Sequence, residues 1–176
     1  ELEDEVVCIL GTGSIAQAIA TRFKPFHVKI IGVNTNGRLI ENFDECYAMK
    51  DIKLALAKSD IVVMSLPLTD DTKYFFDESH FEAMKQGSMF INIGRGRIID
   101  ESALVKHLNN HHLAFAVLDV METEPLPQVS ELWTTENLLI TPHDSGVSDK
   151  TGVRLLKLFI ENIECFQNNN PLHNRV

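Results

Sequence analysis

The chain has 176 residues, of which 44% are hydrophobic and 23% charged, proportions typical of a globular protein with one full-sized core. Sixteen basic and 25 acidic residues give a net charge of −9, which disfavours general binding to nucleic acid or to an anionic membrane, because both require a basic surface. The sequence contains no apolar run that could cross a bilayer, and its acidic residues 1–5 are unlike a signal peptide. We therefore expect a cytoplasmic protein.

The cysteines and histidines show no pattern typical of a disulfide or a metal site. Cys8, Cys46 and Cys165 are far apart and odd in number, which agrees with a reducing compartment, and Cys8 lies in an apolar run that predicts burial. His107 and His111 are four residues apart, but at a polar helix end this spacing is typical of a solvated face rather than a metal site. We expect no bound metal.

In chain order, short apolar segments alternate with helical ones, a pattern that predicts a parallel sheet covered by helices. Several of the expected strands are almost wholly apolar, as is typical of strands buried on both faces. The expected strands are residues 6–10, 28–33, 61–66, 89–93, 115–118 and 138–140. The fold class predicted is α/β, a Rossmann-type doubly wound parallel sheet in three layers, α/β/α.

Helices are expected between these strands and after the last of them. Two of them begin at an aspartate that can cap the helix, and the last has apolar residues on two neighbouring stripes, which favours packing against more than one surface. The expected helices are residues 15–23, 77–85, 100–108 and 149–166.

The segment Gly11-Thr12-Gly13-Ser14-Ile15-Ala16 follows the first strand and opens the first helix. In this setting GxGxxG/A is the dinucleotide-binding fingerprint, although glycines alone also occur in ordinary turns. Gly11 permits the tight turn, and Gly13 lets the backbone approach a pyrophosphate. The N–H groups of Ser14 and Ile15, at the positive end of the helix, can then hold the phosphates.

The end of the second strand bears on the choice between NAD and NADP. An acidic residue about 20 positions after the glycines would bind the ribose 2′-hydroxyl of NAD and repel a 2′-phosphate. Here Asn34 and Thr35 can hydrogen-bond either cofactor, and Arg38 could pair with a phosphate. The alternative is a polar turn in which Arg38 is merely solvated, so both cofactors stay open.

Three polar residues follow separate apolar strands: Arg95, Glu124 and His143. Ligands of open α/β sheets bind beyond the carboxyl ends of the strands, so these side chains are expected to converge beside the nucleotide. Taken singly, each has an ordinary explanation, as a charge near a helix, a turn residue and a hydrogen-bonded loop histidine.

Together the motifs resemble the cofactor domain of the D-isomer-specific 2-hydroxyacid dehydrogenases. The resemblance covers about residues 6–176, nearly the whole chain, and its motifs occur in the family's order. They are Gly11-x-Gly13-x-Ile15, Leu66-Pro67-Leu68-Thr69-x-x-Thr72, Ile91-Asn92-x-x-Arg95-Gly96, Leu118-Asp119-Val120-x-Glu122-x-Glu124-Pro125 and Thr141-Pro142-His143-x-x-Gly146.

The resemblance implies hydride transfer between NAD or NADP and a small 2-keto or D-2-hydroxy acid. His143 would be the general acid and base, and Glu124 would orient the imidazole and favour its charged form. Arg95 would bind the substrate carboxylate and polarise the carbonyl. The further cofactor contacts that the family implies would be made by Leu66, Pro67, Thr72, Ile93 and, toward the nicotinamide carboxamide, Asp119.

The chain departs from the family in four places, the first of which is Ala16 where a third glycine is commoner. Asn34 replaces the usual acid, and Asp144 follows the histidine where a small or apolar residue is common. The family's substrate domain is built mainly from chain before the glycine motif, and we expect that this sequence is a fragment without it, which would bind nucleotide with little turnover. We divide the chain into a dinucleotide-binding domain, residues 1–148, and a helix and tail, residues 149–176, that would return to the absent domain.

Two other functions stay open. A nucleotide-sensing, non-catalytic protein of the corepressor type has the same fold, and formate dehydrogenase has a similar pattern. Formate dehydrogenase pairs its histidine with glutamine, so Glu124 argues against it. The resemblance also implies a homodimer, with an interface around residues 98–113 and 121–133.

Overall fold

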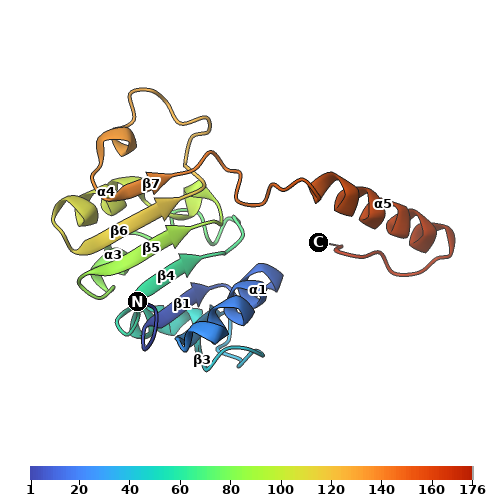
Figure 1. Cartoon of the computed structure of the whole chain (residues 1–176), viewed down its shortest axis with the longest axis horizontal. Helices are drawn as coiled ribbons and strands as arrows, with labels where there is room; N and C mark the ends of the chain where they lie inside the picture. The colour runs from blue at the N-terminus through green and yellow to red at the C-terminus, as the bar shows by residue number, and fades with distance from the viewer. Residues whose placement is uncertain (176) are drawn as a thin grey trace. The chain divides into compact units, whose positions relative to one another are not determined.

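The computed structural model describes residues 1–175, and they form two compact units, Glu1–His143 and a second that begins at Asp144 (Figure 1). The first unit contains a seven-stranded sheet in the order β3-β2-β1-β4-β5-β6-β7, and every neighbouring pair of strands is parallel. The strands are β1 (Val6–Leu10), β2 (Lys29–Asn34), β3 (Glu45–Ala48), β4 (Ile61–Met64), β5 (Ser88–Asn92), β6 (Leu113–Leu118) and β7 (Leu138–Ile140).

The order of the strands confirms the doubly wound fold. From the central β1 the chain builds outward through β2 and β3, then returns to place β4 on the other side of β1 and continues to β7. The two directions part between β1 and β4, where Leu10 pairs with Met64. In open parallel sheets, this switch point is where ligands bind, at the carboxyl ends of the strands.

Helices cover the sheet because its strands are apolar on both faces. Along β1, Val7 and Ile9 belong to one buried cluster and Cys8 and Leu10 to the other, so alternate residues enter opposite cores. The burial of Cys8 that the sequence predicts is confirmed. The helices are α1 (Ser14–Phe23), α2 (Ile52–Leu56), α3 (Glu78–Glu82), α4 (Glu101–Asn109) and α5 (Thr151–Gln167), with short 3-10 turns at Lys24–Phe26, Met49–Asp51, Gly96–Ile98 and Glu131–Thr134.

Both aspartate caps form as the sequence predicts. Asp77 accepts a hydrogen bond from the Ser79 N–H at 3.0 Å, and Asp100 accepts from Ser102 and Ala103 at 3.0 and 3.2 Å. The α3 helix is shorter than expected, and the polar edge strand β3 and the single-turn α2 were not among the expected elements.

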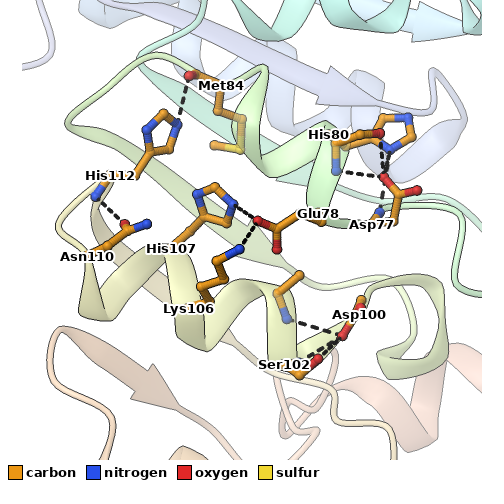
Figure 2. Close-up of polar contacts among 12 residues, drawn as sticks. Asp77, Glu78, His80, Met84, Asp100, Ser102, Lys106, His107, Asn110 and His112 are labelled. Atoms are coloured by element: carbon orange, nitrogen blue, oxygen red, sulfur yellow. Dashed lines mark hydrogen bonds and ion pairs between the residues drawn. The ribbon is translucent and has the colours of Figure 1, made fainter.

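The prediction that the His107 face is solvated is wrong, because α3 covers it (Figure 2). His107 is 5% exposed, stacks on Phe81 with ring centroids 5.9 Å apart, and lies 3.3 Å from a Glu78 oxygen that also binds Lys106. His111, one turn later, is exposed. No group of three potential metal ligands occurs among residues 1–175.

The second unit consists mainly of α5 and the segment after it. Asn162 accepts a hydrogen bond from the His173 N–H at 2.7 Å, which ties that segment to the helix. Most of the large apolar side chains of α5 are exposed, among them Val153, Leu156, Phe159, Ile160 and Phe166. Within the described residues, 1–175, α5 and the other helices are all too short or too polar to span a bilayer.

Candidate active site

The glycine turn joins the carboxyl end of β1 to α1. Gly11 has φ +96°, which a side chain would strain, and its N–H donates to the Val33 carbonyl at 2.8 Å. Gly13 begins the helix in an extended conformation, and a methyl group on it would meet nothing within 4 Å. Its backbone therefore lies open toward solvent. Ser14 and Ile15, which contribute the first N–H groups of α1, are also exposed.

A hollow of about 400 Å³ lies at this switch point. Three loops line it: the glycine turn, the segment after β4 and the segment after β5. Its lining includes Gly13, Ser14, Ile15, Leu66, Pro67, Ile93 and Arg95. The predicted cofactor residues among them, from Gly13 to Ile93, are therefore neighbours, although they come from parts of the chain up to 80 positions apart. Arg95, which is predicted to be catalytic, lines the same hollow. An exposed helix N-terminus beside such a hollow suits the pyrophosphate of a dinucleotide.

Two other sets of residues that are predicted to bind the cofactor do not line this hollow. Thr72 donates its hydroxyl hydrogen to the Pro67 carbonyl at 2.7 Å and accepts from the Thr69 N–H at 2.7 Å, so it fixes the loop that presents Pro67. Asn34, Thr35 and Arg38 form a turn at the end of β2, the strand next to β1.

Arg95 is positioned by Asn92, a residue of the family motif to which the sequence alone assigned no role. Asn92 is fully buried at the end of β5, where its side-chain oxygen accepts from the Gly94 N–H at 3.0 Å and its amide donates to the Arg95 carbonyl at 3.3 Å. Gly94 passes so close to Leu66 that a methyl group on it would lie 2.8 Å from the Leu66 carbonyl oxygen. The signal available in the sequence was an asparagine ending an otherwise apolar strand.

His143 and Glu124 form a direct pair. The His143 Nδ1 and the Glu124 Oε2 are 2.7 Å apart, and the other carboxylate oxygen accepts from the Met121 N–H at 2.9 Å. Because a carboxylate can only accept, Nδ1 holds the hydrogen and Nε2 is directed elsewhere. Burial raises the pKa of Glu124, but the hydrogen bonds from His143 and Met121 outweigh it and leave the pKa below its ordinary value.

The backbone of His143 is itself unusual, with φ +57° in the left-handed region. His143 lies just after β7. The neighbouring strand, β6, ends at Leu118, next to Asp119. Asp119 is 3% exposed and accepts a hydrogen bond from the Thr141 hydroxyl at 2.5 Å. This contact fixes the segment that leads into His143, so Thr141 is a second supporting residue, one that the sequence placed in a motif without a role.

The three predicted catalytic residues share one hollow. Arg95, Glu124 and His143 line a depression of about 220 Å³ together with Leu68, Gly96, Arg97, Met121 and Glu122. Arg95 also lines the larger hollow at the glycine turn. A cationic guanidinium, an imidazole held by a carboxylate, and an open nucleotide-sized hollow are thus adjacent. This set can bind a small anion and exchange a proton with it beside a bound nucleotide.

A doubly wound parallel sheet with a glycine turn at its switch point defines a Rossmann-type dinucleotide-binding domain. Comparison with known families agrees. Residues 1–145 match the family described as D-isomer specific 2-hydroxyacid dehydrogenase, NAD binding domain. The chain belongs to this family.

Relatives in sequence and in structure lie in the same family. A glyoxylate reductase of Aeropyrum pernix is 35% identical over 167 residues, which cover 94% of this chain and 50% of that protein. The crystal structure of a D-isomer specific 2-hydroxyacid dehydrogenase family protein from Aeromonas salmonicida has a TM-score of 0.92 at 39% identity, covering 99% of this chain and 56% of that one.

A third relative is an NADPH-dependent glyoxylate/hydroxypyruvate reductase from Sinorhizobium meliloti, crystallised with NADP and sulfate. Its TM-score is 0.91 at 33% identity, covering 100% of this chain and 56% of that one. The chain spans about half the length of the curated relatives it matches.

Proposed function

We propose that this chain is the cofactor-binding and proton-transferring part of an NAD(P)-dependent enzyme that interconverts a small 2-keto acid and a D-2-hydroxy acid. The observation that supports this most is the 2.7 Å contact between His143 and Glu124 in the hollow that Arg95 also lines. An imidazole held by a carboxylate beside a guanidinium is the set of groups that keto-acid reduction requires.

His143 is the proposed general acid. In the direction of reduction the protonated imidazole donates its Nε2 proton to the keto oxygen of the substrate, and in the reverse direction it takes that proton back. Glu124 accepts from Nδ1 throughout, which orients the ring and stabilises its positive charge. A nicotinamide cofactor would be held at the hollow lined by Gly13, Ser14 and Ile15 and would supply the hydride for the reduction.

Arg95 is the proposed anchor for the substrate. Its guanidinium donates to the Gly94 carbonyl at 2.7 Å through one nitrogen, and the rest of its planar fork can bind a carboxylate. The positive charge also polarises the keto group and stabilises the negative charge that develops on its oxygen. The relatives named as glyoxylate and glyoxylate/hydroxypyruvate reductases support two- and three-carbon keto acids as substrates.

The proposal has two tests. Calorimetry on the 176-residue chain should detect NADH or NADPH binding, and a chimera in which this chain replaces the matching half of the Aeropyrum pernix enzyme should oxidise the cofactor with glyoxylate or hydroxypyruvate. His143→Gln in the chimera should abolish most of the turnover and leave cofactor affinity within about twofold, because the imidazole acts on the substrate. Undiminished turnover in His143→Gln would contradict the assignment.

A further inference from the structure

A second arginine, Arg97, lines the hollow that contains the proposed catalytic residues. The hollow has a volume of about 220 Å³, and its lining includes Arg95 and Arg97 together with the acids Glu122 and Glu124. Arg95 has a place in the proposed reaction as the anchor of the substrate carboxylate. Arg97 has none, although it is exposed at the same depression. The hollow therefore offers a second guanidinium to any small ligand that Arg95 binds.

The backbone fixes the position of Arg97. It lies in the short 3-10 turn that follows Arg95, and its carbonyl accepts a hydrogen bond from the Tyr74 N–H at 2.8 Å. The Phe76 N–H donates to the next carbonyl, that of Ile98, at 3.0 Å. These two contacts hold the turn against the segment after β4, so the separation between the two arginines is set by ordered backbone on both sides.

The guanidinium of Arg97 makes one hydrogen bond within the chain. Its Nε donates to the backbone carbonyl of Glu122 at 3.3 Å. Among residues 1–175, its two terminal nitrogens take part in no hydrogen bond or ion pair. The contact at Nε orients the planar group and leaves those two nitrogens available, and a pair of such N–H donors matches the two oxygens of a carboxylate.

The acids that line the hollow are bound by other partners. The Tyr74 hydroxyl donates to the Glu122 carboxylate, and the Glu122 N–H donates to Glu101 at 2.6 Å. The hydrogen bond to Glu122 raises the pKa of Tyr74, so the phenol keeps its proton at neutral pH. Glu124 is engaged by His143 at 2.7 Å. The charge of Arg97 is therefore available to a ligand.

We infer that Arg97 is a specificity-determining residue that binds a second carboxylate, so that the preferred substrate is a small 2-keto dicarboxylic acid. Arg95 binds the carboxylate next to the keto group, and Arg97 binds the one at the far end. The inference rests on the proposed function, whose anchor at Arg95 it keeps, and goes beyond it in naming the second anionic group. Tyr74 is a positioning residue, because its hydroxyl holds the Glu122 carboxylate that would otherwise pair with Arg97.

The test is nitrogen-15 NMR of the arginine side chains of the 176-residue chain, titrated with D-malate and with D-lactate in the presence of NAD⁺ or NADP⁺. Both hydroxy acids carry the carboxylate and hydroxyl that Arg95 and His143 would bind, and D-malate adds the second carboxylate. We expect D-malate to bind about tenfold more tightly at low ionic strength and to shift the Arg97 Nε resonance, which D-lactate should leave in place. High salt should reduce the difference, because an exposed ion pair is screened.

Substitutions of Arg97 test its role directly. Arg97→Gln should weaken D-malate about tenfold, to the affinity of D-lactate, and should affect D-lactate much less. Arg97→Lys should retain part of the preference, since it keeps the charge without the planar fork. Arg22→Gln is the matched control, because Arg22 is an exposed arginine at the end of α1 whose guanidinium donates to the Ala18 carbonyl at 2.8 Å, and it should change neither affinity.

Tyr74→Phe tests the positioning. Loss of the hydroxyl frees the Glu122 carboxylate to pair with Arg97, so D-malate should bind several-fold more weakly. Adding Glu122→Gln removes the competing charge and should restore the D-malate affinity of the parent chain. A merely structural effect of the lost hydroxyl would not be rescued by the second substitution.

The outcomes distinguish the two proposals. If D-malate binds no more tightly than D-lactate, or if Arg97→Gln weakens both equally, the second-carboxylate site is overturned while the proposed function stands. If D-3-phosphoglycerate binds more tightly than D-malate, the second group is a phosphate ester and the dicarboxylic acid is overturned. If the nucleotide binds and neither hydroxy acid does, the anchor at Arg95 in the proposed function fails, and the site at Arg97 fails with it.

Discussion

Gly96 lies against the backbone of Met121 so closely that a methyl group on Gly96 would come within 1.9 Å of the Met121 carbonyl carbon. This approach joins two loops that hold different parts of the site. Arg95 precedes Gly96, and the Met121 N–H binds the carboxylate of Glu124. The distance between the guanidinium loop and the Glu124–His143 pair therefore depends on the absence of one side chain.

Gly96→Ala should destabilise the first unit by about 2–4 kcal/mol, because the contact is with backbone that has to move. Urea unfolding followed by the fluorescence of Trp133 measures the change. Gly152→Ala is the control, since a methyl group there meets nothing within 4 Å and should leave the unfolding of residues 1–143 unchanged. Equal stability of Gly96→Ala and the parent chain would refute the close approach.

His143→Gly should raise the pKa of Glu124. Burial raises the pKa of Glu124 and the hydrogen bond from His143 lowers it, so without His143 only the Met121 hydrogen bond and the charge of Arg95 oppose burial. In the parent chain the pKa of Glu124 is lower in the folded state than its ordinary value of 4.5. The resulting contribution to stability is fully present above pH 4.5 and is lost as the pH falls through the lowered pKa. The variant should lose that contribution at a higher pH. Carbon-13 NMR titration of the Glu124 carboxyl tests this, and an unchanged midpoint would contradict the pairing.

Asp77→Ala should cost about 1 kcal/mol at neutral pH through loss of the α3 cap. Hydrogen bonds from Ser79 and then His80 lower the pKa of Asp77 to about 2, against the effect of burial. The charged cap is thus fully effective above pH 3.8 and is lost as the pH falls through about 2. Asp77→Asn keeps the hydrogen-bond acceptor without the charge. As the pH falls from 3.8 to about 2 the parent chain loses the stability of its charged cap, so the variant should become more stable relative to the parent. A difference in stability between Asp77→Asn and the parent chain that does not vary with pH would contradict a role for the charge.

His107→Leu should leave stability unchanged or raise it by up to about 1 kcal/mol, because the buried Nδ1 of His107 has no hydrogen-bond partner. Leucine is close to histidine in volume, and Glu78 keeps its 2.6 Å contact with Lys106 (Figure 2). His107→Gln is the control, since it returns a polar group to the same buried place. Thermal melts compare them, and a loss of more than about 1 kcal/mol in the leucine variant would show that the imidazole is needed.

Two copies of the chain should associate through the surfaces that the family resemblance implies, around residues 98–113 and 121–133. Val129 in this region is 95% exposed, and an apolar residue so placed is suited to an interface. Val129→Glu should weaken the dimer in sedimentation experiments, whereas Leu39→Glu, on a 63% exposed side chain outside this region, should not. A monomer at high concentration would contradict the prediction.

The parallel sheet was predictable from sequence because its strands are apolar on both faces and its helices begin at capping residues. The edge strand β3 was not, since Glu45–Ala48 has a polar residue, a cysteine and a tyrosine, and forms only by pairing with β2. The burial of His107 could not be predicted either, because α3, about 25 residues earlier, decides which face of α4 is covered.

The candidate site was predictable where chemistry required particular side chains at the ends of strands. Arg95, Glu124 and His143 are brought to one hollow as expected. The supporting contacts were not predictable. Nothing in the sequence says that Asn92 holds the Arg95 loop or that Asn34 uses both ends of its amide within its own turn. Such contacts depend on backbone paths that a residue pattern does not specify.

The left-handed backbone of His143 has a consequence for protein engineering. A residue with a Cβ at φ +57° costs about 1 kcal/mol more than glycine, so backbone energy alone would favour glycine or asparagine here. A laboratory selection for thermostability alone will tend to replace the residue that we propose as the proton donor. The surviving variants will fold well and fail in turnover, so a stability screen of this family should hold position 143 fixed.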